Sequence, residues 1–294
     1  MIKISVITVC YNMSAFIEQT ILSVVSQRYP NLEYIIVDGG STDGTQAIIE
    51  KYKAHLAYYV SEPDNGMYDA IAKGFSHATG AVLAWLNADD IYLPWTFSVV
   101  NEIFSTFPDT KWIGGKHAYL DENGRLTNIF AKCSIKSQSD IRHGWCRGDV
   151  LGPLQQESMF WTKDLYDQVG GLNVSLKYAG DFSLWTQFSR FSSLAKVDLP
   201  LAAFRKRKNS LSVAGNDMYD DEINTILSHD KRYPSFLWKM CSESALLIQI
   251  LRQLRFRKGI VFLYDMKSQQ MKRKRVWGNC SNHTISSLLL YCKK

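Results

Sequence analysis

Apolar runs and segments with helical spacing alternate along the first third of the chain. The apolar runs are rich in β-branched residues, which is typical of buried parallel strands. They cover residues 3–10, 32–37, 56–60 and 81–86. The segments between them are predicted as helices over residues 14–27, 42–52 and 67–77. This β-α-β-α-β-α-β order predicts an α/β fold with a mostly parallel, Rossmann-like sheet flanked by helices.

The second half of the chain has a more mixed pattern. The elements predicted there are helices over 94–107, 163–169 and 181–191 and strands over 112–114 and 155–161. Asn123-Gly124 predicts a hairpin turn. The predicted division is a domain over 1–212, made of halves 1–93 and 94–212, and a helical basic extension over 213–294.

Two acidic turns follow predicted strands. Asp38 ends the second strand, and Asp89 and Asp90 follow the fourth. In an open α/β sheet the ligand crevice lies at the carboxyl ends of the strands, so both turns are expected to line one cleft. Adjacent carboxylates repel each other, and a divalent cation with oxygen ligands relieves that repulsion. The alternative is that Asp89 and Asp90 only cap the helix that begins near Pro94.

The mouth of this cleft carries groups that suit a nucleotide. Tyr11 follows the first strand, and its ring can stack on a nucleobase or be a half-buried aromatic at a helix start. The Asp38 carboxylate can accept the imide N–H of uracil or thymine, or it can cap its turn. GxGxxG is absent after the first strand, which argues against an NAD site.

Three segments in this order resemble glycosyltransferase family 2. They are ISVITVCYN at 4–12, DGGSTDGT at 38–45 and LNADD at 86–90. Within that family, SEPDNGMYDA at 61–70 resembles the branch that builds bacterial surface polysaccharides such as O-antigen. The resemblance extends over about residues 1–210. It implies a GT-A fold, a nucleotide-sugar donor such as a UDP-sugar, a divalent cation (Mg or Mn), a lipid-diphosphate-linked saccharide acceptor and inversion at the anomeric carbon.

The resemblance also implies roles for individual donor-site residues. Val9 and Tyr11 would contact the base, Asp38 the uracil edge, Asn87 the ribose or a phosphate, and Asp89 the metal. The family's DxD motif has an aspartate where this chain has Asn87, so Asp90 is an additional candidate metal ligand. Asp69 would lie near the crevice, although a helical ion pair with Lys73 explains it equally well.

Inverting transfer needs a base that takes the proton of the acceptor hydroxyl. Asp181 follows a glycine and opens a predicted helix, resembling the family's acidic motif, so it is the expected base; helix capping is its alternative role. Glu157 is the second candidate. Residues 204–212 correspond to a loop that in relatives often carries a histidine near the diphosphate. Here four consecutive cations, at 205–208, can screen the same charge or face water.

Charge divides the chain into two unequal parts. Residues 1–230 carry a net charge of −6 and residues 231–294 a net charge of +12. Apolar and cationic residues alternate over 246–263, which predicts an amphipathic helix or helix pair, and 272–275 add four cations. This tail can bind an anionic membrane surface, or it can pack on the catalytic domain with its cations in water.

The remaining features point to a cytoplasmic enzyme, peripheral on the inner face of the cell membrane if the tail binds lipid. The chain has no signal-type N-terminus and no apolar run of the roughly 20 residues that a spanning helix needs. Its six cysteines lack metal-site spacing, which suits reduced thiols. A nucleotidyltransferase is the rival enzyme, but it would need a glycine-rich basic loop after the first strand. A nucleic-acid-binding protein is the non-enzymatic rival, but the aromatic residues are not interleaved with the basic ones, so no nucleic-acid partner is expected.

Overall fold

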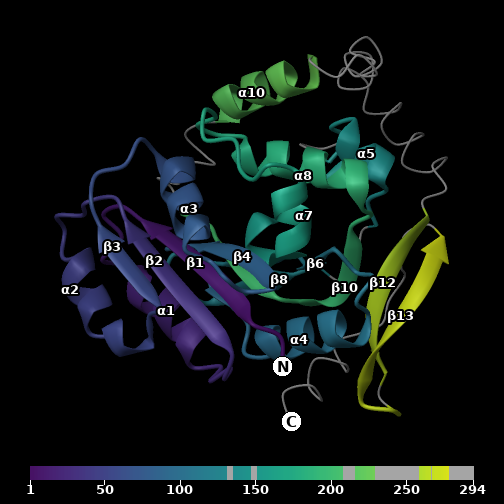
Figure 1. Cartoon of the computed structure of the whole chain (residues 1–294), viewed down its shortest axis with the longest axis horizontal. Helices are drawn as coiled ribbons and strands as arrows, with labels where there is room; N and C mark the ends of the chain where they lie inside the picture. Colours follow the sequence, from purple (N-terminus) through teal and green to yellow (C-terminus); the bar gives the residue numbers. More distant parts are fainter. Residues whose placement is uncertain (131–134, 147–150, 208–215, 229–257, 266, 278–294) are drawn as a thin grey trace.

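A nine-stranded sheet forms the centre of the molecule (Figure 1). The computed structural model describes residues 1–130, 135–146, 151–207, 216–228, 258–265 and 267–277. In sheet order the strands are β13 (Gln270–Trp277), β12 (Lys258–Asp265), β10 (Ala195–Pro200), β6 (Trp112–Lys116), β9 (Met159–Thr162), β4 (Val82–Asn87), β1 (Ile4–Cys10), β2 (Leu32–Asp38) and β3 (Tyr58–Ser61). Only β9 and β13 run antiparallel to their neighbours among these strands, so the mostly parallel sheet is confirmed.

A second sheet of four short strands lies beside the acidic turn that follows β4. Its order is β5 (Ile91–Tyr92), β11 (Ala202–Arg205), β7 (Ala118–Leu120) and β8 (Leu126–Ile129). The tip of the β7–β8 hairpin contains the predicted Asn123-Gly124 turn, with Gly124 at a φ of +81°. This sheet brings the end of β11 to the acidic turn, which matters for the site described below.

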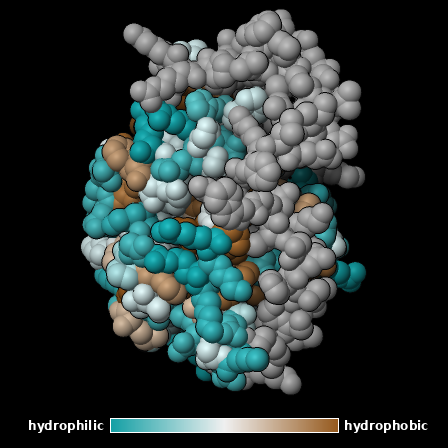
Figure 2. All heavy atoms as spheres, turned by 90° about the vertical axis from the view of Figure 1, so that its right-hand side faces the viewer, coloured by the Kyte–Doolittle hydropathy of each residue, from teal (hydrophilic) through white to brown (hydrophobic). Residues whose placement is uncertain are grey.

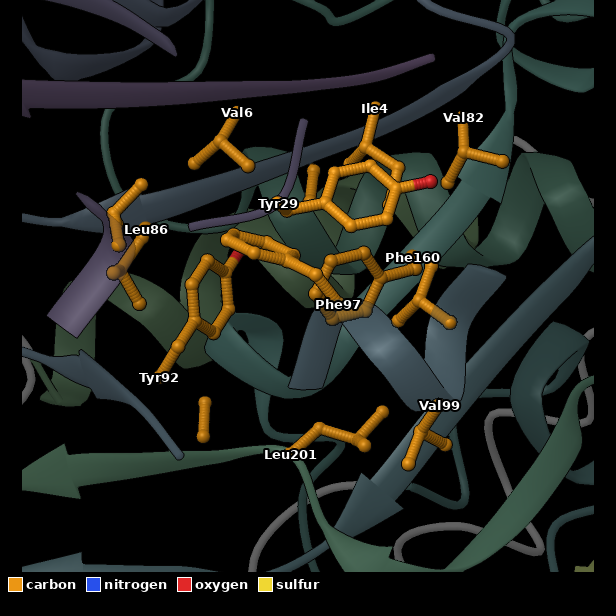
Figure 3. Close-up of a cluster of buried hydrophobic side chains, with 14 of the residues drawn as sticks. Ile4, Val6, Tyr29, Val82, Leu86, Tyr92, Phe97, Val99, Phe160 and Leu201 are labelled. Carbon is orange, nitrogen blue, oxygen red and sulfur yellow. The ribbon is translucent and has the colours of Figure 1, made fainter. Parts of the chain in front are cut away.

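Helices cover both faces of the large sheet (Figure 1). The described helices are α1 (Ile17–Val25), α2 (Thr45–Glu50), α3 (Met67–Ser76), α4 (Thr96–Thr106), α5 (Gln138–Arg142), α7 (Lys163–Gln168), α8 (Gly180–Phe191) and α10 (Asn216–Ser228), with short 3-10 helices η1 (Lys53–His55) and η2 (Gln156–Ser158). Alternate residues of each central strand point to opposite faces, so each face has its own core. One core joins α1, α2 and α4 to the sheet, and part of it is drawn in Figure 3. The other joins α3, α7 and α8.

The register of the central strands brings the predicted site segments to one edge. Val9 of β1 is level with Val37 of β2 and with Asn87 of β4. All three strands are parallel, so the turns that follow them leave the sheet side by side. The pattern of strands and helices predicted for the first third of the chain is thereby confirmed.

The predicted helix over 246–263 is wrong for its last part. Residues 258–265 form β12, which pairs in parallel with β10 and antiparallel with β13. Val261 and Phe262 are adjacent and both fully buried, because the Phe107 ring covers one face and Ile135 the other. A continuous apolar run buried on both sides is a strand pattern, and the interspersed cations obscured it. Residues 246–257 lie outside the described part, and the extension is helical at α10.

Candidate active site

The loops after β1 and β2 are bonded to each other. The Asn12 N–H donates to Ser41 Oγ at 2.7 Å, and the Thr42 N–H donates to Asn12 Oδ1 at 2.9 Å. Asn12 has a φ of +52°, a left-handed conformation that asparagine tolerates better than most residues. These bonds fix the backbone next to Tyr11, whose side chain is 60% exposed. An aromatic ring is thus presented to solvent at the carboxyl edge of the sheet.

Asp38 lies beneath these loops with no exposed surface. Its carboxylate accepts the Ser41 N–H at 2.9 Å and the Ser61 hydroxyl at 2.5 Å, as well as the Ser41 hydroxyl. The Cys10 thiol adds a weaker contact at 3.3 Å, and burial raises the pKa of that thiol. Asp38 therefore holds the loops after β2 and β3 together. Val9, another predicted base contact, is 7% exposed, and its side chain belongs to the core.

A second carboxylate, which was not predicted from the sequence, lies beside Tyr11. Asp64 is half-buried, and its Oδ1 accepts the Gly66 N–H at 2.8 Å. A Cβ on Gly39 would lie 2.6 Å from Asp64 Oδ2 and 3.5 Å from the Tyr11 ring. The absence of a side chain at Gly39 thus lets the Asp64 carboxylate approach the β2 turn. Only Gly39, a glycine directly after the strand-end acid, hints at this in the sequence.

The acidic turn after β4 is closed by two arginines from the end of β11. Asp89 Oδ2 accepts a hydrogen bond from Arg207 Nε at 2.6 Å, and the Asp89 carbonyl accepts one from Arg205 Nε at 2.6 Å. Both guanidinium groups lie over the Phe16 ring, at 5.2 and 5.5 Å. Arg205 is fully buried. Two of the four consecutive cations thus face the acidic turn, whereas Lys206 lies over the Tyr119 ring.

Asp90 is fully buried next to this ion pair. Its Oδ1 accepts the Arg205 N–H at 2.8 Å, and Oδ2 has no partner within the described residues. Burial, followed by the charges of Asp89 and Glu157, raises the pKa of Asp90 well above its usual range. Held in this way, Asp90 supports the turn.

The oxygen atoms at the end of β4 fit a divalent cation shared with a phosphate ligand. Asn87 Oδ1 is buried without a partner in the described part of the chain, and the Asp89 carboxylate lies two residues on. Mg²⁺ usually takes only one or two protein carboxylates and completes its shell with phosphates and water. The described residues hold no cluster of three acidic, histidine or cysteine side chains suited to bind a metal.

Asp181 is the second residue of α8 and is half-buried. Burial raises its pKa to about 6, although the Phe182 N–H, which donates to Asp181 Oδ1 at 2.7 Å, and the Tyr68 hydroxyl partly oppose the rise. A Cβ on Gly180 would lie 2.7 Å from the Tyr68 ring, so the glycine lets α3 and α8 approach each other. Tyr68, missed from the sequence, is thereby placed against the acid.

Glu157, the second candidate base, is 3% exposed in η2. Burial, and then the charges of Asp89 and Asp181, raise its pKa to about 8. Its sensitivity to both charges indicates that the three carboxyl groups share one region. Glu157 is therefore mostly protonated at neutral pH, whereas Asp181 is mostly ionised.

Asp69 contacts the loop before α3. Its Oδ2 accepts the Asn65 N–H at 3.0 Å, while Lys73 donates to Glu62 at 2.6 Å. The predicted alternative, an ion pair between Asp69 and Lys73, is not formed. Asp69 instead orders the loop that carries Asp64.

Comparisons with known proteins find relatives by sequence and by fold. Residues 5–127 match the model of glycosyl transferase family 2. An uncharacterized glycosyltransferase of Rickettsia typhi is 24% identical over 292 residues, which are 95% of this chain and 87% of the relative. One of Haemophilus influenzae is 25% identical over 239 residues, 78% of this chain and 72% of the relative. The crystal structure of S. aureus TarS in complex with UDP-GlcNAc matches with a TM-score of 0.57 at 18% identity, over 71% of this chain and 60% of that chain. This last likeness shows the fold, which is the expected GT-A fold.

Proposed function

We propose that this chain, whose residues 5–127 match glycosyl transferase family 2, is an inverting transferase that moves a sugar from a UDP-sugar to a hydroxyl of a lipid-linked saccharide. The observation that carries the proposal is the pair of carboxyl groups at one edge of the sheet. Asp181, whose pKa lies near 6, suits a base, and Asp89 lies at the end of β4 beside an arginine. TarS, which shares the fold, was crystallised with UDP-GlcNAc.

The nucleobase would lie on the exposed Tyr11 ring. In this proposal the Asp64 carboxylate accepts the imide N–H of uracil, because Asp38 has no exposed surface and its oxygens already accept hydrogen bonds from Ser41 and Ser61. Asp38 keeps the role of shaping the pocket. Val9 would contribute through its backbone, and Asp69 by ordering the loop of Asp64.

The donor diphosphate would lie between the end of β4 and the arginines of β11. Asp89 and Asn87 would hold a Mg or Mn ion there, and such an ion neutralises the charge that develops on the departing diphosphate. Arg207 now pairs with Asp89 and would exchange that partner for a phosphate oxygen when the donor binds. Asp90, which is fully buried and accepts the Arg205 N–H, would support the turn without contacting the ion.

The proposed transfer needs one residue of this chain to move a proton. Asp181 takes the proton of the acceptor hydroxyl as the acceptor oxygen forms its bond to the anomeric carbon. The bond between that carbon and the diphosphate oxygen breaks, and the electron pair leaves with UDP. Attack from the face opposite the leaving group inverts the anomeric configuration. General base catalysis of this kind contributes about 10²–10⁴ in rate.

The acceptor side of the proposal rests on the motif at 61–70 and on the basic C-terminal part. An O-antigen-type acceptor is a saccharide on a lipid diphosphate, which the enzyme would meet at the cytoplasmic face of the membrane. Among the described residues we find no helix whose length and apolar character would let it span a bilayer. Contact with the membrane would therefore be peripheral in this proposal, through the cations of β13.

Nucleotide selectivity tests the proposal. UDP, CDP, ADP and GDP are titrated into the protein by calorimetry with Mn²⁺, and a single-stranded oligonucleotide is titrated as a rival ligand. We expect UDP to bind at least about tenfold more tightly than CDP, about 1.4 kcal/mol, because N3 of cytosine carries no proton for Asp64 to accept.

The variant Asp64→Asn should reduce the preference for UDP over CDP, because its amide can donate a hydrogen bond to cytosine as well as accept one from uracil. Glu62→Gln is the matched control, since Glu62 is exposed on the same loop and pairs with Lys73. The role of Asp64 in binding uracil would be refuted if the wild type bound UDP and CDP equally tightly. It would also be refuted if Asp64→Asn and Glu62→Gln showed the same ratio of UDP to CDP affinity. If only the oligonucleotide bound tightly, the proposal that the crevice binds a nucleotide-sugar would be refuted.

A further inference from the structure

A carboxylate from the C-terminal extension binds the turn that leads into Asp181. Glu222 of α10 accepts the Lys177 N–H at 2.8 Å through Oε1, and the Tyr178 and Ala179 N–H groups at 2.9 and 2.8 Å through Oε2. Three successive backbone N–H groups thus converge on one side chain. Such a concave arrangement of backbone donors favours an anion, and bonds to a charged acceptor are stronger than neutral ones.

Glu222 supports the turn that precedes α8, a helix that has no side-chain cap of its own. The residue that precedes α8 is Ala179, which has no side chain that can accept a hydrogen bond. The first N–H groups of a helix lack intrahelical partners, and a neighbouring Ser, Thr, Asp or Asn usually supplies an acceptor. Here the acceptor for the turn before α8 comes from a residue more than 40 positions further along the chain.

The same turn is bonded to the side chains around Asp181. The Tyr178 carbonyl, which lies between the N–H groups held by Glu222, accepts the Tyr68 hydroxyl at 2.9 Å. The Asp181 N–H in turn donates to the Tyr68 oxygen at 3.4 Å. Movement of the turn would therefore displace Tyr68 and Asp181 together.

Apolar contacts keep Glu222 in place. Ile223 and Leu227 of α10 are buried against Ala179 and Phe182. A Cβ on Gly144 would lie 2.5 Å from Leu227, so α10 is tightly packed on this side. The carboxylate is held by its own helix and does not depend on a flexible loop to reach the turn.

We infer that Glu222 is a positioning residue for the transfer reaction, which it serves by holding the turn at 177–179 and, through it, Tyr68 and Asp181. This inference rests on the proposed function, because it assigns Asp181 the role of base. It makes α10, which lies beyond the predicted catalytic domain boundary at 212, a working part of the active site.

The experiment compares Glu222→Gln with Asp220→Asn, a control that removes the same charge from an exposed position of the same helix. UDP release from the UDP-sugar substrate, UDP affinity and Tm are measured for both variants and for the wild type across pH 4.5–8.5. In Glu222→Gln we expect kcat to fall at least tenfold while the Kd for UDP changes less than twofold.

The acid limb of the pH profile should also move to lower pH in Glu222→Gln. Burial is the main cause of the raised pKa of Asp181, and a loosened turn lets water reach its carboxylate. Glu157, the other titrating group near Asp181, is unchanged and does not cause such a shift. Glu222→Asp, which keeps the charge on a shorter side chain, should give a smaller shift in the same direction and remains informative if Glu222→Gln folds poorly.

Three results would overturn the inference. If both Glu222 variants match Asp220→Asn in kcat and pH profile while the wild type is active, Glu222 does not position the base and the proposed function stands. If UDP affinity and Tm fall in step with kcat, the role of Glu222 is general stability. A wild type that neither binds UDP nor releases it from any UDP-sugar overturns the proposed function and the inference together.

Discussion

Asp181 and Glu157, the two acidic residues nearest the proposed chemistry, differ in how far burial raises their pKa values. Both pKa values are raised, to about 6 for Asp181 and about 8 for Glu157. A base must be ionised to accept a proton, so kcat/KM should rise with pH up to about 6 and stay level above it. Glu157→Gln should leave this limb in place. A limb near pH 8 that disappears in Glu157→Gln would instead make Glu157 the base.

At the residue scale the sequence predicted where the charges lie but not which of them are accessible. Asp38, Asp89 and Asp181 were recognised from strand ends and a helix start. Their environments depend on partners distant in the chain, such as Arg207 for Asp89. Asp64 and Glu222 were missed because a carboxylate in a loop or on an exposed-looking helix face carries no local pattern that marks its target.

At the element scale, the approach of α3 to α8 depends on Gly180. Replacing an exposed helical glycine by alanine usually stabilises a protein by about 0.5–1 kcal/mol. Here the added Cβ would lie 2.7 Å from the Tyr68 ring. We therefore expect Gly180→Ala to lower the free energy of unfolding by about 1–3 kcal/mol, the usual cost of overpacking, in urea titrations. A stabilised variant would contradict the packing described here.

The elements of the first third followed from the sequence because β1, β2 and β4 are buried on both faces and each helix has one apolar side. The hairpin of β12 and β13 did not follow from the sequence. Its cations lie on an edge strand, where they are exposed, and its apolar run lies between α4 and Ile135. Helical and strand periodicities are hard to separate in a short run of this kind, and only pairing with β10 decides between them.

At the scale of the whole molecule, the charge asymmetry places cations on the outer strand of the large sheet. Lys274 and Arg275 are exposed on β13, while Arg273 pairs with Asp109. The side of the molecule that carries this hairpin is mostly hydrophilic over its described part (Figure 2). An exposed basic strand can bind an anionic membrane, with each cation contributing about 1 kcal/mol near the surface.

We expect the full chain to co-sediment with anionic vesicles at low salt and to be released at high salt, because exposed charges are screened there. The double variant Lys274→Glu and Arg275→Glu should lose most of this binding and keep its Tm. Arg273 is left intact so that its ion pair with Asp109 is preserved. Failure of the full chain to bind anionic vesicles at low salt would exclude the membrane role of this strand.

The most direct test of the proposed activity measures the release of UDP from a panel of nucleotide sugars with Mn²⁺ or Mg²⁺, by chromatography, for the wild type and for Asp181→Asn. We expect the wild type to release UDP from a UDP-sugar. We expect Asp181→Asn to bind UDP with unchanged affinity and to release it about 10²–10⁴ times more slowly, because only proton removal is affected. A wild type that releases no UDP from any of the sugars, or an Asp181→Asn variant that releases it at the wild-type rate, would refute the proposed activity.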